Sequence, residues 1–395
     1  MKLTDLDIIF TEPPAPGWGG RYWILTKLTA SNGIIGWGEC YASSVGPKAM
    51  EAVIRDVFER YFLNENPENI EKLFRRVYSS GFTQRPDLTV MGAFSGLEIA
   101  CWDIVGKHRE RPVWALLGGM LNERIRVYSY LYPLPQHDPD AFWHSPEMSA
   151  ESALELVQQG YTALKFDPAG PYTMRGGHMP ALADISRSLE FCRVVREAVG
   201  YRADLLFGTH GQFTTAAAIR LGKGLEPYRL LWFEEPIPPD NLLEFAQVAK
   251  SIRIPVATGE RLCTKAEFGT LLRTGGASIL QPALGRVGGI WEAKKIAAIA
   301  EVFNAQLAPH LYAGPVEWAA NLQLAVSIPN LLMVETIETK FHEGLIRNSI
   351  EVNKGFVSAP QAPGLGIEVD EQLARANPFE GEGLHLQMQD NPCTY

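Results

Sequence analysis

Hydrophobic and polar positions follow two different periods along the chain. Residues 21–29 and 33–39 are rich in β-branched and aromatic side chains, and the Ser-Asn-Gly between them predicts a hairpin turn. Apolar side chains then recur at helical spacing in three segments, at residues 47–62, 67–79 and 90–105. The last segment is apolar and rich in small residues, so we expect a buried helix there. Strands followed by helices predict an α+β domain over residues 1–124.

From about residue 125 the pattern changes to short apolar strands that alternate with amphipathic helices. We expect eight strands, at residues 125–132, 161–167, 203–208, 229–234, 254–259, 277–281, 305–310 and 331–335. This alternation indicates parallel pairing, and eight strands favour a TIM-like barrel over an open doubly wound sheet. An open sheet would carry a glycine-rich loop after an early strand, whereas segment 285–289 follows the sixth. We predict a barrel domain over residues 125–355 and a segment, 356–395, that packs back on the first domain.

Composition and charge limit the partners of this chain. Its 395 residues include 36 Lys and Arg against 45 Asp and Glu, a net charge of −9 without a basic cluster, which argues against nucleic acid. No apolar run reaches the roughly 18–20 residues that span a bilayer, and the N-terminal residues do not resemble a signal peptide. We therefore expect a cytoplasmic protein without a membrane partner. Five cysteines without a Cys-x-x-Cys pair argue against a disulfide framework and a thiolate zinc site.

Ionisable side chains gather where the predicted barrel strands end, which is where such barrels carry their functional residues. The strand-end residues are Lys165, Asp167, Gly208, His210, Glu234, Glu235, Glu260, Gln281, His310 and Glu335. Glu234 and Glu260 end adjacent strands, so their carboxylates would repel each other unless a cation lay between them. Hard oxygen ligands suit Mg²⁺, which we expect as the cofactor. A small anionic substrate is compatible with the acidic chain, because a local pocket can oppose the global charge.

Three segments resemble the enolase superfamily, in its mandelate racemase and muconate lactonizing enzyme-like branch. They are WFEEP at 232–236, ATGERL at 257–262 and GLEIACWDIVGKHRERPVWALLGG at 96–119. The resemblance implies an α/β fold, a (β/α)7β modified TIM barrel with an N-terminal α+β capping domain, and a homo-oligomer. It also implies a Mg²⁺ ion held by Glu234 and Glu260. That ion would stabilise the enediolate formed when the α-proton of a carboxylate substrate is removed.

The resemblance has one prominent gap. Glu234 and Glu260 are 26 residues apart, and the same step back from Glu234 reaches Gly208, where the family has its first metal-ligating Asp. The Asp-x-His of the branch's sugar-acid dehydratases is here Gly208-x-His210. We expect His210 either to complete the metal shell as an imidazole ligand or to act as the general acid on the departing hydroxyl group; a structural histidine is the third possibility.

The proton-transfer residues also depart from the family pattern. His310 matches the family's histidine base, but Ala283 stands where an Asp usually orients that imidazole. The Lys-x-Lys motif of the second strand is Lys165-x-Asp167, so Asp167 replaces the usual catalytic lysine. We expect Lys165 to bind a substrate oxygen or to lower the pKa values of its neighbours. Glu335 matches the family's hydrogen-bonding carboxylate and is expected to contact the substrate.

Two loops are expected to reach the barrel mouth and to set specificity. The insertion at residues 169–181 is too long for an ordinary βα loop, and the loop at 12–22 belongs to the capping domain. With a residue that follows the sixth strand, these loops supply the candidate substrate-binding residues Trp18, Arg21, Tyr172, His178 and Arg286.

The function that these residues indicate is abstraction of an α-proton from a carboxylate substrate. Dehydration of a sugar acid, an aldonate or aldarate, to a 2-keto-3-deoxy acid is the reaction we expect. A sugar-acid epimerase or racemase and a lactone cycloisomerase of the same branch are the alternatives. The missing second lysine argues against a racemase that would use it as one of two bases. A non-catalytic barrel is a further alternative, because Gly208 and Ala283 replace carboxylates of the family.

Overall fold

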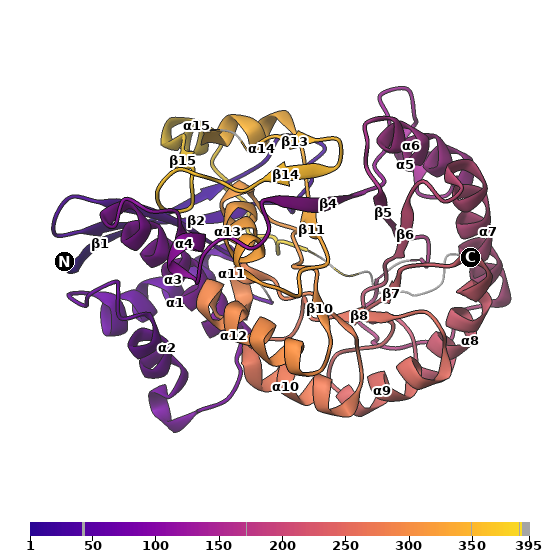
Figure 1. Cartoon of the computed structure of the whole chain (residues 1–395), viewed down its shortest axis with the longest axis horizontal. Helices are drawn as coiled ribbons and strands as arrows, with labels where there is room; N and C mark the ends of the chain where they lie inside the picture. Colours follow the sequence, from indigo (N-terminus) through magenta and orange to yellow (C-terminus); the bar gives the residue numbers. More distant parts are fainter. Residues whose placement is uncertain (42–43, 171, 349, 387, 389–395) are drawn as a thin grey trace.

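The computed structural model of the chain describes residues 1–41, 44–170, 172–348, 350–386 and 388. Figure 1 shows two regions side by side, a cap built from the N-terminal elements and a ring of strands with helices around it. The predicted combination of a capping domain and a barrel is confirmed by this arrangement.

The cap consists of a three-stranded antiparallel sheet and three main helices. The strands are β1 (Leu3–Thr11), β2 (Trp23–Ala30) and β3 (Ile35–Cys40), in the order β1-β2-β3. The helices are α1 (Pro47–Val57), which continues into a π turn at Phe58–Phe62, α2 (Ile70–Tyr78) and α3 (Leu88–His108). The predicted hairpin and helices are confirmed, whereas β1 was not predicted.

Helix α3 is the buried core of the cap, as its apolar sequence predicted. It packs on the sheet so closely that a Cβ on Gly38 of β3 would lie 1.9 Å from the Gly96 carbonyl oxygen, so only glycine fits there. Within the described residues, α3 is also the one helix long and apolar enough to cross a membrane. Because 83% of its most apolar window is buried inside the protein, we interpret it as a core helix.

Eight parallel strands form the barrel. They are β4 (Arg124–Tyr130), β5 (Ala163–Phe166), β6 (Asp204–Phe207), β7 (Trp232–Glu234), β8 (Val256–Thr258), β9 (Ile279–Leu280), β10 (Gln306–Leu307) and β11 (Val334–Thr336). Each pairs with the next along the chain up to β10, and β11 pairs with β4. The remaining link, between β10 and the segment before β11, is a parallel bridge between Leu307 and Leu331. All eight predicted strands are present.

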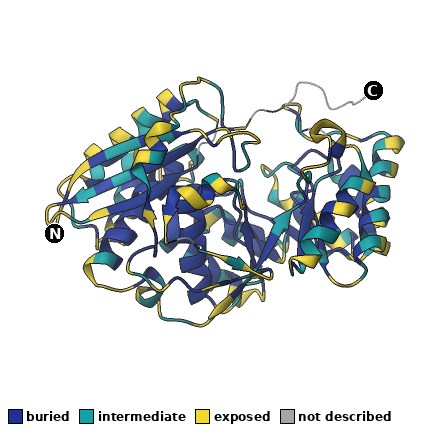
Figure 2. Cartoon of the chain, turned by 90° about the horizontal axis from the view of Figure 1, so that it is seen from above, coloured by how far each residue is buried: buried dark blue, intermediate teal, exposed yellow. Residues whose placement is uncertain are grey.

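Helices cover the outside of this ring, with their outward faces exposed and the strands buried (Figure 2). The longer ones are α6 (Pro146–Gln158), α7 (Leu182–Val199), α8 (Thr215–Leu225), α9 (Leu242–Ser251), α10 (Thr264–Thr274), α12 (Gly289–Val302) and α13 (Pro315–Ser327). Short helices are α4 (Val113–Leu116), α5 (Pro139–Phe142), α11 (Leu284–Val287), α14 (Lys340–Leu345) and α15 (Glu371–Ala376). Two 3-10 turns lie at Ser80–Phe82 and Glu226–Tyr228.

The C-terminal segment contacts both regions. Strands β13 (Val352–Asn353) and β14 (Phe356–Ser358) pair with each other, and β14 also pairs with β4 of the barrel. Strands β12 (Ile346–Arg347) and β15 (Glu368–Val369) form a second small ribbon. Further along, Glu371 forms an ion pair with Lys27 of β2 (2.6 Å). The domain boundaries expected from the sequence stay a prediction.

Buried carboxylates of the cap bind the starts of barrel helices. Glu98 of α3 accepts hydrogen bonds from two N–H groups at the start of α12 (2.8 and 2.9 Å), and Glu39 of β3 accepts two at the start of α13 (2.6 and 2.9 Å). A Cβ on Gly289 would lie 2.0 Å from Glu98 Oε2, so the first residue of α12 must be glycine. These bonds satisfy helix N-termini that the interface would otherwise leave unpaired.

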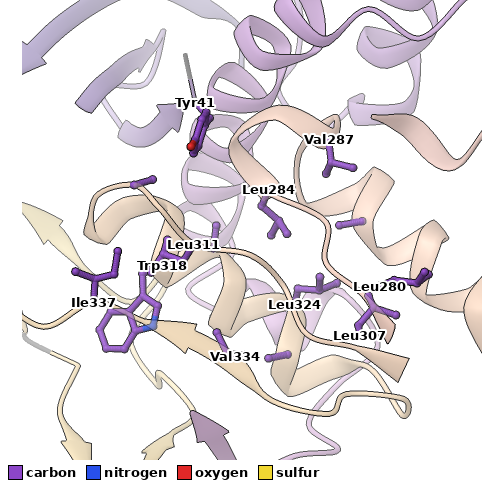
Figure 3. Close-up of a cluster of buried hydrophobic side chains, with 14 of the residues drawn as sticks. Tyr41, Leu280, Leu284, Val287, Leu307, Leu311, Trp318, Leu324, Val334 and Ile337 are labelled. Atoms are coloured by element: carbon purple, nitrogen blue, oxygen red, sulfur yellow. The ribbon is translucent and has the colours of Figure 1, made fainter. Parts of the chain in front are cut away.

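Apolar side chains complete the joint between the two regions. Figure 3 shows Tyr41, which follows β3, beside a cluster whose other labelled members come from the barrel and the segment that follows it. Among them, Leu280 and Leu307 lie on neighbouring strands and Leu284 on α11. The end of strand β3 in the cap and the barrel therefore share one hydrophobic core. This core fixes the position of cap residues over the strand ends.

Candidate active site

The carboxyl ends of the barrel strands bring five predicted site residues into one buried layer. Lys165 lies on β5, Glu234 ends β7 and Glu335 lies on β11, while Glu260 and His310 follow β8 and β10. All five are at most 7% exposed. Parallel strands of a barrel end on the same face, which is why residues up to 170 positions apart in the sequence meet there.

Lys165 is the centre of one half of this layer. Its Nζ lies 2.5 Å from Glu234 Oε1 and 3.5 Å from Glu335 Oε1, and 5.4 Å from the ring centroid of Tyr130. Burial alone would lower the pKa of Lys165, but the two carboxylates outweigh it and hold that pKa well above its ordinary value. Lys165 is therefore a permanently charged ammonium group.

The other oxygen of Glu234 is also hydrogen bonded. Its Oε2 accepts from the indole Nε1 of Trp232 (2.9 Å) and from the amide Nε2 of Gln281 (2.8 Å). Burial raises the pKa of Glu234 to about 7, against the opposing effect of Lys165. Glu335 in turn accepts from the N–H of Leu311 through Oε2 (2.8 Å). We call this set the Lys165 cluster: Lys165, Trp232, Glu234, Gln281 and Glu335.

The second half is a row of alternating carboxylates and imidazoles. His210 lies between Asp167, 3.3 Å from its Nδ1, and Glu260, 3.9 Å from its Nε2. The other oxygen of Glu260 lies 3.3 Å from Nε2 of His310. We call this row, Asp167, His210, Glu260 and His310, the histidine chain. Its members are close but, unlike those of the Lys165 cluster, mostly lack hydrogen bonds to one another.

The two imidazoles differ in their electrostatic surroundings. Burial lowers the pKa of His210, but the carboxylates of Glu260 and Asp167 outweigh it and leave that pKa above its ordinary value of 6.5. Burial also lowers the pKa of His310, and here it dominates, so that the pKa stays below 6.5. Burial opposes ionisation of Glu260, yet the flanking imidazoles hold its pKa below the usual range. The pKa of His210 is therefore raised and that of His310 lowered, so His210 holds a proton more readily than His310 does.

Several buried polar atoms of this layer have no hydrogen bond within the described part of the chain. They are both carboxylate oxygens of Asp167, Oε2 of Glu260, Nδ1 of His210 and His310, Oε1 of Gln281 and Nε of Arg286. Buried polar groups are normally paired, so a concentration of unpaired ones marks the place where a polar ligand would bind. Five of these seven atoms belong to the histidine chain.

The predicted substrate-binding residues divide into two groups. Tyr172 packs on His210 (ring centroids 4.2 Å apart) and Trp18 stacks on Tyr132 just after β4 (4.3 Å), so both loops reach the site. Residue 171 of the insertion lies outside the described residues. Arg286, on α11, is 7% exposed and its guanidinium lies 3.6 Å from the ring centroid of Tyr41.

Arg21 and His178 have their recorded contacts with loops around the site. Arg21 is exposed, and its backbone N–H donates to the carbonyl oxygen of His385 (3.4 Å). His178 packs beside Phe213 (5.6 Å) and its N–H donates to the Gln212 carbonyl, so it attaches the insertion to the loop after β6. Their substrate contacts stay predictions.

His385 is a site neighbour that the sequence analysis missed. It comes from the C-terminal segment, is 6% exposed, and lies 4.8 Å from the ring centroid of Tyr41, which itself lies 6.0 Å from His310. Burial lowers the pKa of His385 to about 3, so the imidazole is neutral. One residue of the sequence bears on this contact. Gly20 leaves room for the imidazole, because a Cβ at that position would lie 1.9 Å from His385 Nε2.

The donors at the strand ends differ from the magnesium site that the resemblance implies in what they bind in this structure. Gly208 has no side-chain donor, and both oxygens of Glu234 already accept hydrogen bonds from protein groups. His210, expected to complete the shell, lies between Asp167 and Glu260. Among the described residues, no three acidic, histidine or cysteine side chains are grouped as a metal site. Glu234, Glu260 and His210 stay the predicted ligand set, and the proton transfers at this site are assigned to its own side chains.

Sequence comparisons match both regions of the chain to known proteins. The family described as mandelate racemase / muconate lactonizing enzyme, N-terminal domain, matches residues 19–118, and the one described as enolase C-terminal domain-like matches residues 148–373. D-gluconate/D-galactonate dehydratase of Picrophilus torridus is 34% identical over 376 residues, which cover 94% of this chain and 93% of that protein. D-xylonate dehydratase of Haloferax volcanii is 33% identical over 390 residues, covering 97% and 90%.

The similarity extends to solved structures over the full length. The crystal structure of a mandelate racemase/muconate lactonizing enzyme from Sulfitobacter sp is 72% identical, has a TM-score of 0.99 and covers all of both chains. The predicted fold, cap and barrel together, is thus confirmed by an independent comparison. The chain belongs to the mandelate racemase and muconate lactonizing enzyme family of the enolase superfamily.

Proposed function

We propose that the protein is a hydro-lyase that dehydrates a sugar acid to a 2-keto-3-deoxy acid. The observation that supports this most is the histidine chain, in which the imidazoles of His210 and His310 lie 3.9 and 3.3 Å from the carboxylate of Glu260 and differ in how readily they hold a proton. An elimination needs such a pair, because one group must take a proton from the α-carbon while another gives a proton to the departing hydroxyl group.

His310 is the base and His210 the acid in this proposal. The imidazole of His310 takes the α-proton, and the electron pair of the broken C–H bond forms the Cα–Cβ double bond through the enediolate. The Cβ–O bond breaks, and the hydroxyl group leaves as water with the proton from Nε2 of His210. The enol product then becomes the ketone, so one proton is gained by His310 and one is lost by His210. Glu260 holds the two imidazoles apart and favours the charged form of His210.

Two cations are available for the substrate's carboxylate and hydroxyl oxygens. Arg286 is buried and its Nε has no partner within the described residues, and Lys165 lies between Glu234 and Glu335 in the same layer. Their charges favour a small anionic substrate in an otherwise acidic protein. The curated relatives are named for aldonates, D-gluconate, D-galactonate and D-xylonate, and we extend this substrate class to the present chain. A cytoplasmic location and a homo-oligomeric state are retained as parts of the proposal.

A diastereomer screen tests this assignment. The protein is incubated with a panel of aldonates and aldarates, and 2-keto acid formation is measured with semicarbazide, alongside exchange of the α-proton in deuterated water. Keto acid formation that is lost in His310→Asn, but kept in His144→Asn at an exposed histidine, supports the proposal. Exchange without keto acid would indicate an epimerase instead. No turnover and no exchange across the whole panel would overturn the proposal.

A further inference from the structure

We infer that the ammonium group of Lys165 takes the part that a divalent cation plays elsewhere in this family, so that the site works without a bound metal ion. The inference rests on the proposed function, because it concerns how the enediolate of that reaction is stabilised. It depends on three features of the strand ends: the position of Lys165, the missing side chain at residue 208, and the contacts that Glu234 and Glu260 make with other side chains.

Lys165 lies where its charge faces two carboxylates of the layer. Its Nζ contacts Glu234 at 2.5 Å and Glu335 at 3.5 Å, and the side chain is 2% exposed. Each ammonium group carries three protons, so two carboxylates leave one proton for a substrate oxygen. In a site without bulk water, a fixed charge of this kind stabilises a developing oxyanion much more than it would in solvent.

Gly208 is the counterpart of this arrangement. An ideal Cβ placed on Gly208 would lie 3.3 Å from Cε of Lys165 and 3.5 Å from the hydroxyl oxygen of Tyr130. A carboxylate side chain at this position would extend further into the space that the lysine occupies. The missing side chain therefore does two things at once: it removes a metal donor, and it makes room for the ammonium group.

Glu234 is fully hydrogen bonded, and Glu260 lies between two imidazoles. Glu234 accepts from Lys165, Trp232 and Gln281, so that both of its oxygens are occupied by N–H donors. Glu260 faces His210 and His310. A divalent ion bound by both glutamates would have to displace donors from Glu234 and come close to the Lys165 ammonium, and like charges at that separation repel strongly in a buried site.

Metal analysis of the purified protein gives the first test. After dialysis against EDTA, we expect no stoichiometric magnesium, manganese or zinc by plasma mass spectrometry, no heat of binding when MgCl₂ is titrated by calorimetry, and keto acid formation within about twofold of the untreated protein. An activity that disappears with EDTA and returns with Mg²⁺ would refute the inference while leaving the dehydratase assignment in place. If no substrate is turned over at all, the calorimetry still decides: saturable Mg²⁺ binding with unit stoichiometry refutes the inference, and its absence supports it.

Substitution of the lysine gives the second test. Lys165→Met should lower kcat by about 10²–10³-fold, as loss of a preorganised oxyanion-stabilising group does. Lys250→Met, at an exposed lysine, is the matched control. Because Lys165→Met leaves Glu234 unpaired, Lys165→Cys alkylated with 2-bromoethylamine serves as the second variant. Recovery of activity on alkylation, without added metal, supports a charge that acts on the substrate; activity of Lys165→Met equal to wild type would refute it.

Discussion

The two halves of the strand-end layer are built on opposite principles. In the Lys165 cluster, both oxygens of Glu234 are satisfied, because they accept hydrogen bonds from Lys165, Trp232 and Gln281. In the histidine chain, neighbours lie 3.3–3.9 Å apart and most of their polar atoms have no hydrogen bond within the described residues. A satisfied buried network rigidifies a fold, whereas an unsatisfied one costs stability until a ligand completes it. The difference indicates that one half holds charge in place and the other half awaits the substrate.

The largest effect is expected at the base. His310→Asn should lower kcat by about 10³–10⁴-fold, since removal of a general base costs roughly that much, while the free energy of unfolding should change little because Nδ1 of His310 has no partner to lose. Steady-state kinetics and urea unfolding of the same preparation measure both quantities. If His310→Asn lost much of its free energy of unfolding but kept the wild-type kcat, the histidine chain would be a structural network and not a catalytic one.

The next effect is expected at the acid. His210→Asn should lower kcat by about 10²–10³-fold and change the pH profile. The base must be neutral, so the wild-type rate rises as the pH increases through the pKa of His310, which lies below 6.5. The acid must be protonated, so the rate falls again above the raised pKa of His210. Loss of only this alkaline limb in His210→Asn is the expected signature; an unchanged bell-shaped profile would remove His210 from the reaction.

A paired substitution compares the stabilities of the two halves. Gln281→Leu removes a donor from Glu234 and should lower the free energy of unfolding by about 1–2 kcal/mol, as loss of one partner of a buried group does. Asp167→Asn removes a buried charge whose oxygens lack hydrogen bonds, so stability should stay level or rise slightly. Urea denaturation at pH 7 measures both. Equal losses in the two variants would show that the halves are equally satisfied.

The smallest effect is expected at the rim. Tyr172→Ala removes the ring that packs on His210 and should raise KM by about 3–10-fold, because an aromatic contact contributes roughly 0.5–1.5 kcal/mol. Tyr201→Ala, at an exposed tyrosine elsewhere, is the control. A fall in kcat as large as that of His210→Asn would instead place Tyr172 among the groups that act on the reacting atoms.

Most of the barrel followed from the sequence because buried parallel strands are short apolar runs, and strand ends converge by geometry. That reasoning brought together Lys165, Glu234, Glu260 and His310. It missed β1, because the buried apolar side chains of Leu3, Leu6 and Ile9 recur at every third position, whereas a strand is recognised by alternation at every second.

The pairing of site residues was beyond the sequence for a different reason. Residue type and spacing predict that Glu260 lies at the strand ends. They do not predict that its carboxylate lies beside the imidazoles of His210 and His310. Likewise, nothing near His385 predicts its place beside Tyr41, because the contact joins segments more than 300 residues apart. Side-chain partners depend on packing across the whole fold, and short-range patterns do not contain that information.

The wall around the site is assembled from three separate places in the chain: Trp18 from the capping loop, Tyr172 from the insertion after β5, and His385 from the C-terminal segment. None of these segments supplies a member of the histidine chain. During divergence, each can lengthen, shorten or change its side chains while the strand ends keep their chemistry. Substrate preference in this lineage can therefore evolve in small, independent steps, with the catalytic layer inherited unchanged.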